Sequence, residues 1–174
     1  ADPVGEGTQA VMYPWPERVA ATLVLAVNLL TAQFSTTVPG AIARPYIGHR
    51  TPAEQGALYA QGRWSLEDVN RLRRGVGMPP ISRYANRYVV TLLRPGLSVH
   101  NENPSRAVDI VIVCRGKEAW SDKTDCDGDG VPDYEEMGMI AEKLGLVWGG
   151  RWKRFPDIGH LELPPKGEVP RGLY

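Results

Sequence analysis

The stretch RPGLSVHNENPSRAVDIVI, from Arg94 to Ile112, contains the feature that decides the fold of this chain. Its second half, continued to Cys114, is AVDIVIVC, an apolar and β-branched run that predicts the strongest strand in the sequence. Asp109 interrupts this run, and a carboxylate in an apolar strand requires a partner. We therefore expect a small sheet that contains this strand, with a polar partner beside Asp109.

The flanking segments predict a mixed α+β fold. The helix at 51–61 has the clearest start, because Thr51, Pro52 and Glu54 form a capping box with proline in the first turn. Residues 63–88 are charged and contain several breakers, so they are predicted to be irregular. Further helices are expected at 16–34 and 135–144, further strands at 41–48, 89–93, 146–148 and 158–163, and an extended lead-in at 1–16. We expect one domain over 1–174, a small antiparallel sheet with packed helices.

Composition and charge exclude several classes of protein. Lys plus Arg and Asp plus Glu each number 20, so there is no basic excess for nucleic acid or for a membrane surface. The longest apolar stretch, 19–30, is interrupted by Thr22 and Asn28 and is shorter than the roughly 20 residues of a membrane span. Cys114 and Cys126 either form one disulfide in an exported protein or are two free thiols.

The three histidines of the chain are His49, His100 and His160. Together with Asp109, the last two supply three nitrogen and oxygen ligands and leave a fourth position for water, as a catalytic zinc requires. Asp157 precedes His160 by three residues, and a carboxylate there can take a proton from water and pass it to a leaving amine. The spacing alone leaves the metal site open, because an isolated histidine is more often a packed or surface side chain than a ligand.

Three motifs occur in order along the chain: GHRTPAEQGALYAQGR at 48–63, SVH at 98–100 followed by AVD at 107–109, and WGGRWKRFPDIGHLEL at 148–163. They resemble the motifs of the zinc peptidase family that contains D-Ala-D-Ala carboxypeptidases and L-alanyl-D-glutamate endopeptidases. That family has a Tyr-Arg-Thr/Ser segment leading into a helix, then Ser-x-His and Ala-x-Asp, and finally an acid three residues before a histidine. The resemblance implies the zinc peptidase fold of the D-Ala-D-Ala carboxypeptidase type.

The resemblance also implies the roles of individual residues. Zinc would be bound by His100, Asp109 and His160, and Asp157 would be the general base. Arg50 would stabilise the oxyanion of the tetrahedral intermediate or hold the substrate, because a guanidinium attracts developing negative charge. Ser98 and Gln55 would help to shape the substrate site.

The expected substrate is the stem peptide of peptidoglycan. The Trp-Gly-Gly-x-Trp segment at 148–152 resembles the endopeptidase branch of the family, which cuts between L-Ala and D-Glu. The two tryptophans are equally suited to be core or cleft-wall side chains, and both descriptions can hold. The alternative activity is that of a D-Ala-D-Ala carboxypeptidase.

Two departures from the family pattern affect these expectations. The first histidine and the aspartate are separated by eight residues instead of six, and Asn101–Arg106 lacks the glycine of the family. We expect the extra residues to bulge out between the ligands. His49 stands where the family has tyrosine, and we expect it to pack and not to bind metal.

The segment DCDGDGVPDYEE at 125–136 matches the EF-hand calcium loop at every ligand position. So many carboxylates in one loop repel one another unless a cation neutralises them. The preceding segment, 117–122, is at most a short helix, which favours one calcium loop inserted in the peptidase, where calcium stabilises or regulates the active-site side. The expected calcium ligands are Asp125, Asp127, Asp129, the Val131 carbonyl, Asp133 and Glu136.

Two hypotheses compete with an active peptidase. One is a non-catalytic module that binds cell-wall peptide or calcium, and the other is a structural calcium protein without zinc. The complete ligand set together with Asp157 favours the enzyme. We expect a monomer that acts on peptidoglycan in the periplasm, at the cell wall or after secretion, or as a released phage lysin.

Overall fold

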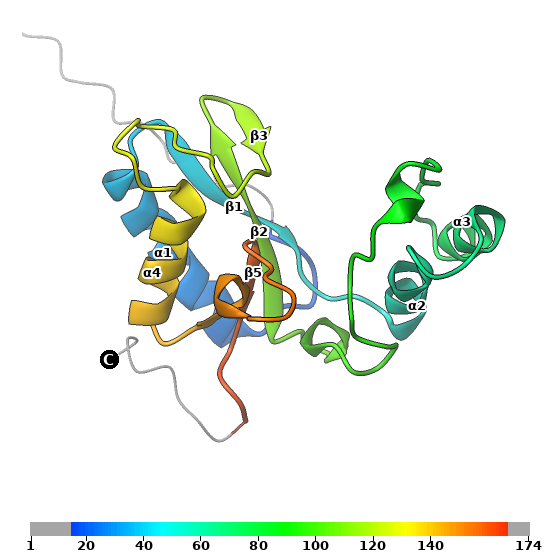
Figure 1. The fold of residues 1–174 in the computed structure, drawn as a ribbon. Helices are drawn as coiled ribbons and strands as arrows, with labels where there is room; N and C mark the ends of the chain where they lie inside the picture. Colours follow the sequence, from blue (N-terminus) through cyan, green and yellow to red (C-terminus); the bar gives the residue numbers. More distant parts are fainter. Residues whose placement is uncertain (1–14, 167–174) are drawn as a thin grey trace, which may run out of the picture.

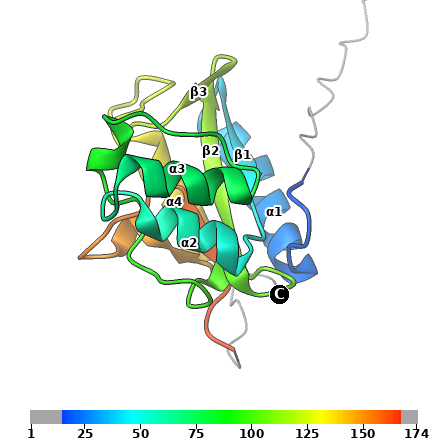
Figure 2. The same ribbon diagram turned by 90° about the vertical axis from the view of Figure 1, so that its right-hand side faces the viewer.

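A computed structural model describes residues 15–166 of the chain. Within this range a small antiparallel sheet lies between two helical layers (Figures 1 and 2). Helices α1 (Ala21–Thr37) and α4 (Asp133–Lys143) cover one face, and α2 (Pro52–Ala60) and α3 (Leu66–Gly75) lie on the opposite side. The mixed architecture predicted from the sequence is confirmed, and the lead-in predicted at 1–16 falls almost wholly outside the described residues.

The sheet is organised around β2 (Ala107–Cys114), the strand predicted from AVDIVIVC. β1 (Ala41–Ile47) pairs with one edge of β2, and β5 (His160–Glu162) pairs with β2 and with β4 (Val147–Trp148). The short strand β3 (Lys117–Ala119) forms a hairpin with the end of β2. All of these pairings are antiparallel. The strands predicted at 107–114, 41–48, 146–148 and 158–163 are confirmed.

The alternation of side chains along β2 separates the core from the polar site. Val108, Ile110 and Ile112 belong to the core that α1 and α4 cover. Successive side chains of a strand point to opposite faces, so Asp109 points away from this core. The register places Asp109 directly opposite His160 of β5. Two candidate zinc ligands are therefore brought together by ordinary sheet pairing.

The main core fills the space between the sheet and helices α1 and α4. The apolar stretch predicted as a helix is α1, but it begins at Ala21 and not at Pro16, because Arg18 has a positive φ of 55° and Val19 bridges to Ser105. None of the helices in the described range is long and apolar enough to cross a membrane. The large buried side chains of this core are Leu23, Val27, Leu30, Phe34, Ile110, Ile112, Tyr134, Met137 and Leu161.

Three local predictions are wrong. Residues 66–75 form α3 and are not irregular, because Ser65 caps the helix by accepting from the Asp68 amide and Val69 is buried against the neighbouring elements. Residues 89–93 are not a strand, since no neighbouring strand is available to pair with them. Lys117–Ala119 is strand β3 and not the start of a short helix.

The two cysteines form a disulfide in this structure. Cys114, at the end of β2, is bonded to Cys126 in the acidic loop, with 5.7 Å between the two Cα atoms. Of the two alternatives left by the sequence, the bridge is the one observed. It attaches the acidic loop to the central strand of the sheet.

Candidate metal centre and active site

Three side chains from separate parts of the chain converge at the predicted zinc site. His100 comes from the 3₁₀ turn Val99–Asn101, Asp109 from β2 and His160 from β5. Nε2 of His100 lies 3.2 Å from Oδ1 of Asp109 and 3.2 Å from Nδ1 of His160, and the last two atoms are 3.3 Å apart. The three potential ligand atoms thus form a nearly equilateral triangle.

This triangle has the dimensions of a zinc site. With metal–ligand bonds of 2.0–2.1 Å, neighbouring ligands of a tetrahedral zinc ion lie about 3.3 Å apart. The observed separations of 3.2 to 3.3 Å match one face of such a tetrahedron and leave its fourth vertex for water or substrate. The donor set of two imidazoles and one carboxylate is one that catalytic zinc accepts.

The outward-facing nitrogens of both histidines are held by acceptors. Nδ1 of His100 donates to the carbonyl of Gly48 at 2.7 Å, and Nε2 of His160 donates to Oε2 of Glu162 at 2.9 Å. Because these protons are on the outer nitrogens, the inner nitrogens keep a lone pair for a metal ion. Such outer partners fix the tautomer and orientation of metal-binding histidines.

The charges around the centre favour a cation at this point. Burial raises the pKa of Asp109, but the hydrogen bonds and charges of His100 and His160 outweigh it and hold that pKa far below its usual range. Burial lowers the pKa of His160, but Asp109 and Glu162 outweigh it and raise the pKa to about 9. The two carboxylates therefore stabilise positive charge between the imidazoles, where zinc would lie.

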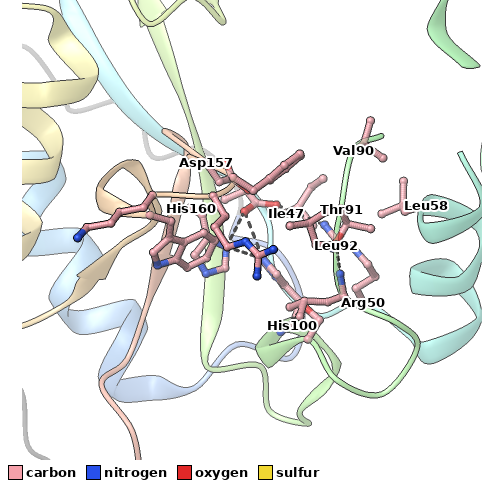
Figure 3. Close-up of a pocket in the computed structure, with 16 residues that line it drawn as sticks. Ile47, Arg50, Leu58, Val90, Thr91, Leu92, His100, Asp157 and His160 are labelled. Atoms are coloured by element: carbon pink, nitrogen blue, oxygen red, sulfur yellow. Dashed lines mark hydrogen bonds and ion pairs between the residues drawn. The ribbon is translucent and has the colours of Figure 1, made fainter. Parts of the chain in front are cut away.

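Asp157, the predicted general base, lines the same pocket as the three ligands (Figure 3). Burial and the nearby charge of Asp109 raise its pKa, so this carboxylate accepts a proton more readily than one in water. Its backbone amide donates to the carbonyl of Gly149 at 3.0 Å. A Cβ atom on Gly149 would lie 2.6 Å from the Asp157 carbonyl oxygen, so the glycine permits this close approach.

The predicted oxyanion residue Arg50 lies beside the metal ligands. Its guanidinium contacts Oδ2 of Asp109 at 3.4 Å and donates to Oε1 of Gln55 at 2.9 Å. Gln55 is fully buried and also donates to Thr91 and to the carbonyl of Leu93. Gln55 thus supports the site by orienting Arg50 and by tying down the segment 88–93, without lining the pocket itself.

Ser98, predicted to shape the site, is buried and lines the pocket. Its hydroxyl accepts from the backbone amide of His100 at 3.3 Å, which fixes the turn that presents the imidazole. Between His100 and Asp109, Asn103 and Pro104 are exposed, whereas Ser105 is buried and pairs through its backbone with Arg18 and Ala20 ahead of α1. The two extra residues of this segment therefore do not disturb the ligands.

The site opens into a pocket of about 640 Å³ between the sheet and the α2–α3 layer. Figure 3 shows Asp157 and His160 on one side and Val90, Leu92 and Leu58 on the other. Segment 89–93, predicted as a strand, supplies part of this apolar wall, and its backbone is held by side chains such as Gln55 and Arg63. His49 is absent from both the metal cluster and the pocket lining among residues 15–166.

The acidic loop at 125–136 contains a second convergence of carboxylates. Oxygens of Asp125, Asp127 and Asp133 lie within 4.8 Å of one another. Asp133 is fully buried and Glu136 is 7% exposed, and Oδ2 of the first and Oε2 of the second have no hydrogen-bond partner. Burial and the neighbouring aspartates raise the pKa of Glu136 to about 7. Buried acceptors without donors are costly, so this loop is suited to a cation.

Two side chains were given no role in the sequence analysis. Glu162 supports His160, and its position two residues later on the same strand was the signal, because such residues share one face. Arg151 contacts Glu135 at 2.7 Å and Glu142 at 3.1 Å on α4, so it joins the acidic loop's helix to the turn before Asp157. No spacing in the sequence indicated this second pair of contacts.

The sequence is similar to those of known peptidases. Residues 94–163 match the family model described as D-alanyl-D-alanine carboxypeptidase. The peptidoglycan L-alanyl-D-glutamate endopeptidase CwlK of Bacillus subtilis (strain 168) is 34% identical over 119 residues, which are 68% of this chain and 58% of that relative. The chain thus spans less than two thirds of the length of this relative. The crystal structure of Serratia marcescens L-Ala D-Glu endopeptidase ChiX aligns with a TM-score of 0.44 and 22% identity, over 84% of this chain and 81% of that one.

Proposed function

Since residues 94–163 match the D-alanyl-D-alanine carboxypeptidase family, we propose that this chain is a zinc-dependent peptidase that hydrolyses the stem peptides of peptidoglycan. The observation that carries the proposal is the triangle of His100, Asp109 and His160, with sides of 3.2 to 3.3 Å, in the same pocket as Asp157. A packed or structural histidine pair has no need of three ligand atoms at this spacing on the wall of a pocket.

Zinc held by these three residues would act as a Lewis acid on the substrate carbonyl and would increase the acidity of water at the open vertex. In this proposal Asp157, which lines the same pocket, takes the proton from the attacking water and returns it to the leaving amine. Its raised pKa suits both steps, because the carboxylate must hold the proton for a time between them.

Arg50 supplies positive charge where the carbonyl oxygen becomes an oxyanion. Its contacts with Gln55 and Asp109 hold the guanidinium in place before substrate binds, so little reorganisation is needed during the reaction. Ser98 acts indirectly by fixing the His100 turn, besides contributing to the pocket wall.

The bond between L-Ala and D-Glu is the favoured site of cleavage. The relative from Bacillus subtilis is an L-alanyl-D-glutamate endopeptidase, and the similarity covers 68% of this chain. The second candidate is cleavage of D-Ala-D-Ala, which is supported by the description of the matching family.

Digestion of purified peptidoglycan with zinc and calcium present tests the proposal, with new termini determined by mass spectrometry. New N-terminal D-Glu is the expected product. Release of D-Ala alone would assign the second activity instead. A zinc-loaded protein that releases no product from wall of several compositions would contradict the peptidase function and favour a binding module.

The loop at 125–136 serves as a calcium site in this proposal. The two unpartnered buried oxygens, on Asp133 and Glu136, and the clustered carboxylates support it. Calcium takes oxygen ligands in such loops, and Val131 would add its backbone carbonyl while Asp129 completes the set. Calorimetric titration of the zinc-loaded protein with calcium should show one binding site. The variant Glu136→Gln should show no calcium binding.

The compartment and the assembly belong to the same proposal. A disulfide between Cys114 and Cys126 suits an oxidising environment such as the periplasm or the cell exterior. One copy of the chain supplies all three metal ligands, Asp157 and Arg50, so a monomer has a complete site. Light scattering in solution measures the assembly directly.

A further inference from the structure

Two cations in the pocket have no role in the reaction described so far. Lys153 and Arg154 line the pocket beside Asp157, and both are exposed. Neither forms an ion pair with another side chain among residues 15–166. The preceding Arg151 is different, because it is engaged by Glu135 and Glu142 of α4. The same short segment thus contains one structural cation and two that are available to a ligand.

The loop that contains these cations is closed at its base. The carbonyl of Gly149 accepts from the backbone amides of both Trp152, at 3.1 Å, and Asp157, at 3.0 Å. The Trp152 ring lies 4.8 Å from the ring of His160, which packs the start of the loop against the metal centre. Lys153 and Arg154 are therefore held on the same side of the pocket as the general base.

The chemistry of the leaving group places an anion on that side. In the stem peptide, D-glutamate continues the chain through its side-chain carboxyl, so its α-carboxylate is free. The carbon of this carboxylate is about 2.5 Å from the nitrogen of the leaving amine, since both are bonded to one Cα. Asp157 must reach that nitrogen to protonate it, so a group that binds the carboxylate has to lie near Asp157.

The remaining arginine that lines the pocket, Arg50, is already engaged. Arg50 contacts Gln55 and Asp109, and its role is at the carbonyl oxygen. The facing wall, with Leu58, Val90, Leu92 and the neutral Thr91, contributes no positive charge for a carboxylate (Figure 3). The unpaired cations beside Asp157 are the groups that complement the free carboxylate.

We propose that Lys153 and Arg154 bind the free α-carboxylate of D-glutamate on the leaving-group side of the scissile bond. The enzyme is then selective for stem peptides with D-Glu over those in which this carboxyl is amidated to D-isoglutamine. The inference rests on the proposed endopeptidase function and adds a determinant of specificity to it. The free energy of one hydrogen bond to a charged group corresponds to a ratio of about 10- to 100-fold in kcat/KM between the two substrates.

The test compares two synthetic stem peptides, identical except for D-Glu or D-isoglutamine, with the zinc- and calcium-loaded full chain. Wild type should cleave the D-Glu peptide with a kcat/KM about 10- to 100-fold higher. The double variant Lys153→Met, Arg154→Met should lose this preference. Its kcat/KM should fall for the D-Glu peptide, mainly because KM rises, and should stay unchanged for the D-isoglutamine peptide. Lys153→Arg with Arg154→Lys should retain it, since both positive charges are kept.

The controls separate this inference from the proposed function. Lys143→Met removes an exposed cation outside the pocket and should leave both kcat/KM values unchanged. Equal cleavage of both peptides by wild type, or equal losses on both in the double variant, would overturn the carboxylate site while the peptidase function stands. If wild type cleaves neither peptide, the proposed function fails and the inference fails with it.

Discussion

Nε2 of His160 lies 2.9 Å from Oε2 of Glu162, so the carboxylate holds the outer face of an imidazole whose inner nitrogen lies 3.2 Å from Nε2 of His100. The two partners are separated by one residue on β5 and therefore lie on the same face of the strand. This pairing fixes the orientation of a candidate metal ligand on a short strand that lies between β2 and β4.

Replacing Glu162 should weaken zinc binding. The negative charge of Glu162 orients His160 and makes its imidazole more basic, and Glu162→Gln removes that charge. The loss of such a partner lowers metal affinity by about 10- to 100-fold. Competition with a chromophoric chelator measures the change. The exposed Glu67→Gln serves as the matched control and should bind zinc like wild type. Unchanged affinity in Glu162→Gln would contradict a metal-supporting role.

Asp157→Asn should abolish most turnover while zinc is retained. The amide cannot accept the proton of the attacking water, and general base catalysis accounts for about 10²- to 10⁴-fold in rate. Elemental analysis of the purified variant gives the zinc content, and peptide cleavage gives kcat. Asp122→Asn, which changes an exposed carboxylate, should be fully active. Loss of zinc together with activity would instead make Asp157 part of the metal site.

Calcium should raise activity without changing zinc occupancy. Arg151 joins Glu135 and Glu142 of α4 to the turn before Asp157, and Gly138 of α4 packs so closely on Trp148 that a Cβ would lie 2.3 Å from the indole. At 100 times its Kd, calcium should also stabilise the fold by about 2.7 kcal/mol. Activity and melting curves with zinc held constant check both effects. Equal activity with and without calcium would disprove the coupling.

The calcium-free protein should lose stability as the pH rises from the usual carboxyl range toward 7. Burial, followed by the charges of the loop aspartates, raises the folded-state pKa of Glu136 to about 7, so the folded state binds more protons than the unfolded state in this window. Glu136→Gln should weaken this pH dependence, to which other groups with raised pKa values such as Asp157 and His160 also contribute, and should stabilise the calcium-free chain above pH 7. Urea unfolding at pH 5 and pH 8 measures the free energy of unfolding of both proteins. If it changes with pH equally in the variant and in wild type, Glu136 is not a source of the pH dependence.

Removing the disulfide should destabilise the chain and release the acidic loop. Cys114 and Cys126 are 12 residues apart, and a loop of this size corresponds to about 3 kcal/mol of unfolded-state entropy. The double variant Cys114→Ser, Cys126→Ser is compared with wild type by urea unfolding. A reductant should lower the stability of wild type to the level of the variant and should leave the variant unchanged.

Much of the site followed from local sequence. AVDIVIVC specified the central strand, and the placement of Asp109 within it specified a polar group facing away from an apolar core. Thr51 and Glu54 specified the start of α2 through a capping box that the structure contains. These features depend on residue propensities and on contacts between neighbours in sequence, so they can be predicted without knowledge of the fold.

The sequence by itself determined which residue types were available for metal and proton chemistry, while the tertiary structure decided which of them meet. The antiparallel register puts Asp109 opposite His160, and the contact of Arg151 with α4 joins the acidic loop's helix to the segment before the base. Residues 89–93 have strand-like side chains, but no strand lies beside them, and they became the pocket wall instead. Pairing across a sheet and packing between distant elements depend on the whole chain at once, because their energy comes from contacts that no local segment contains.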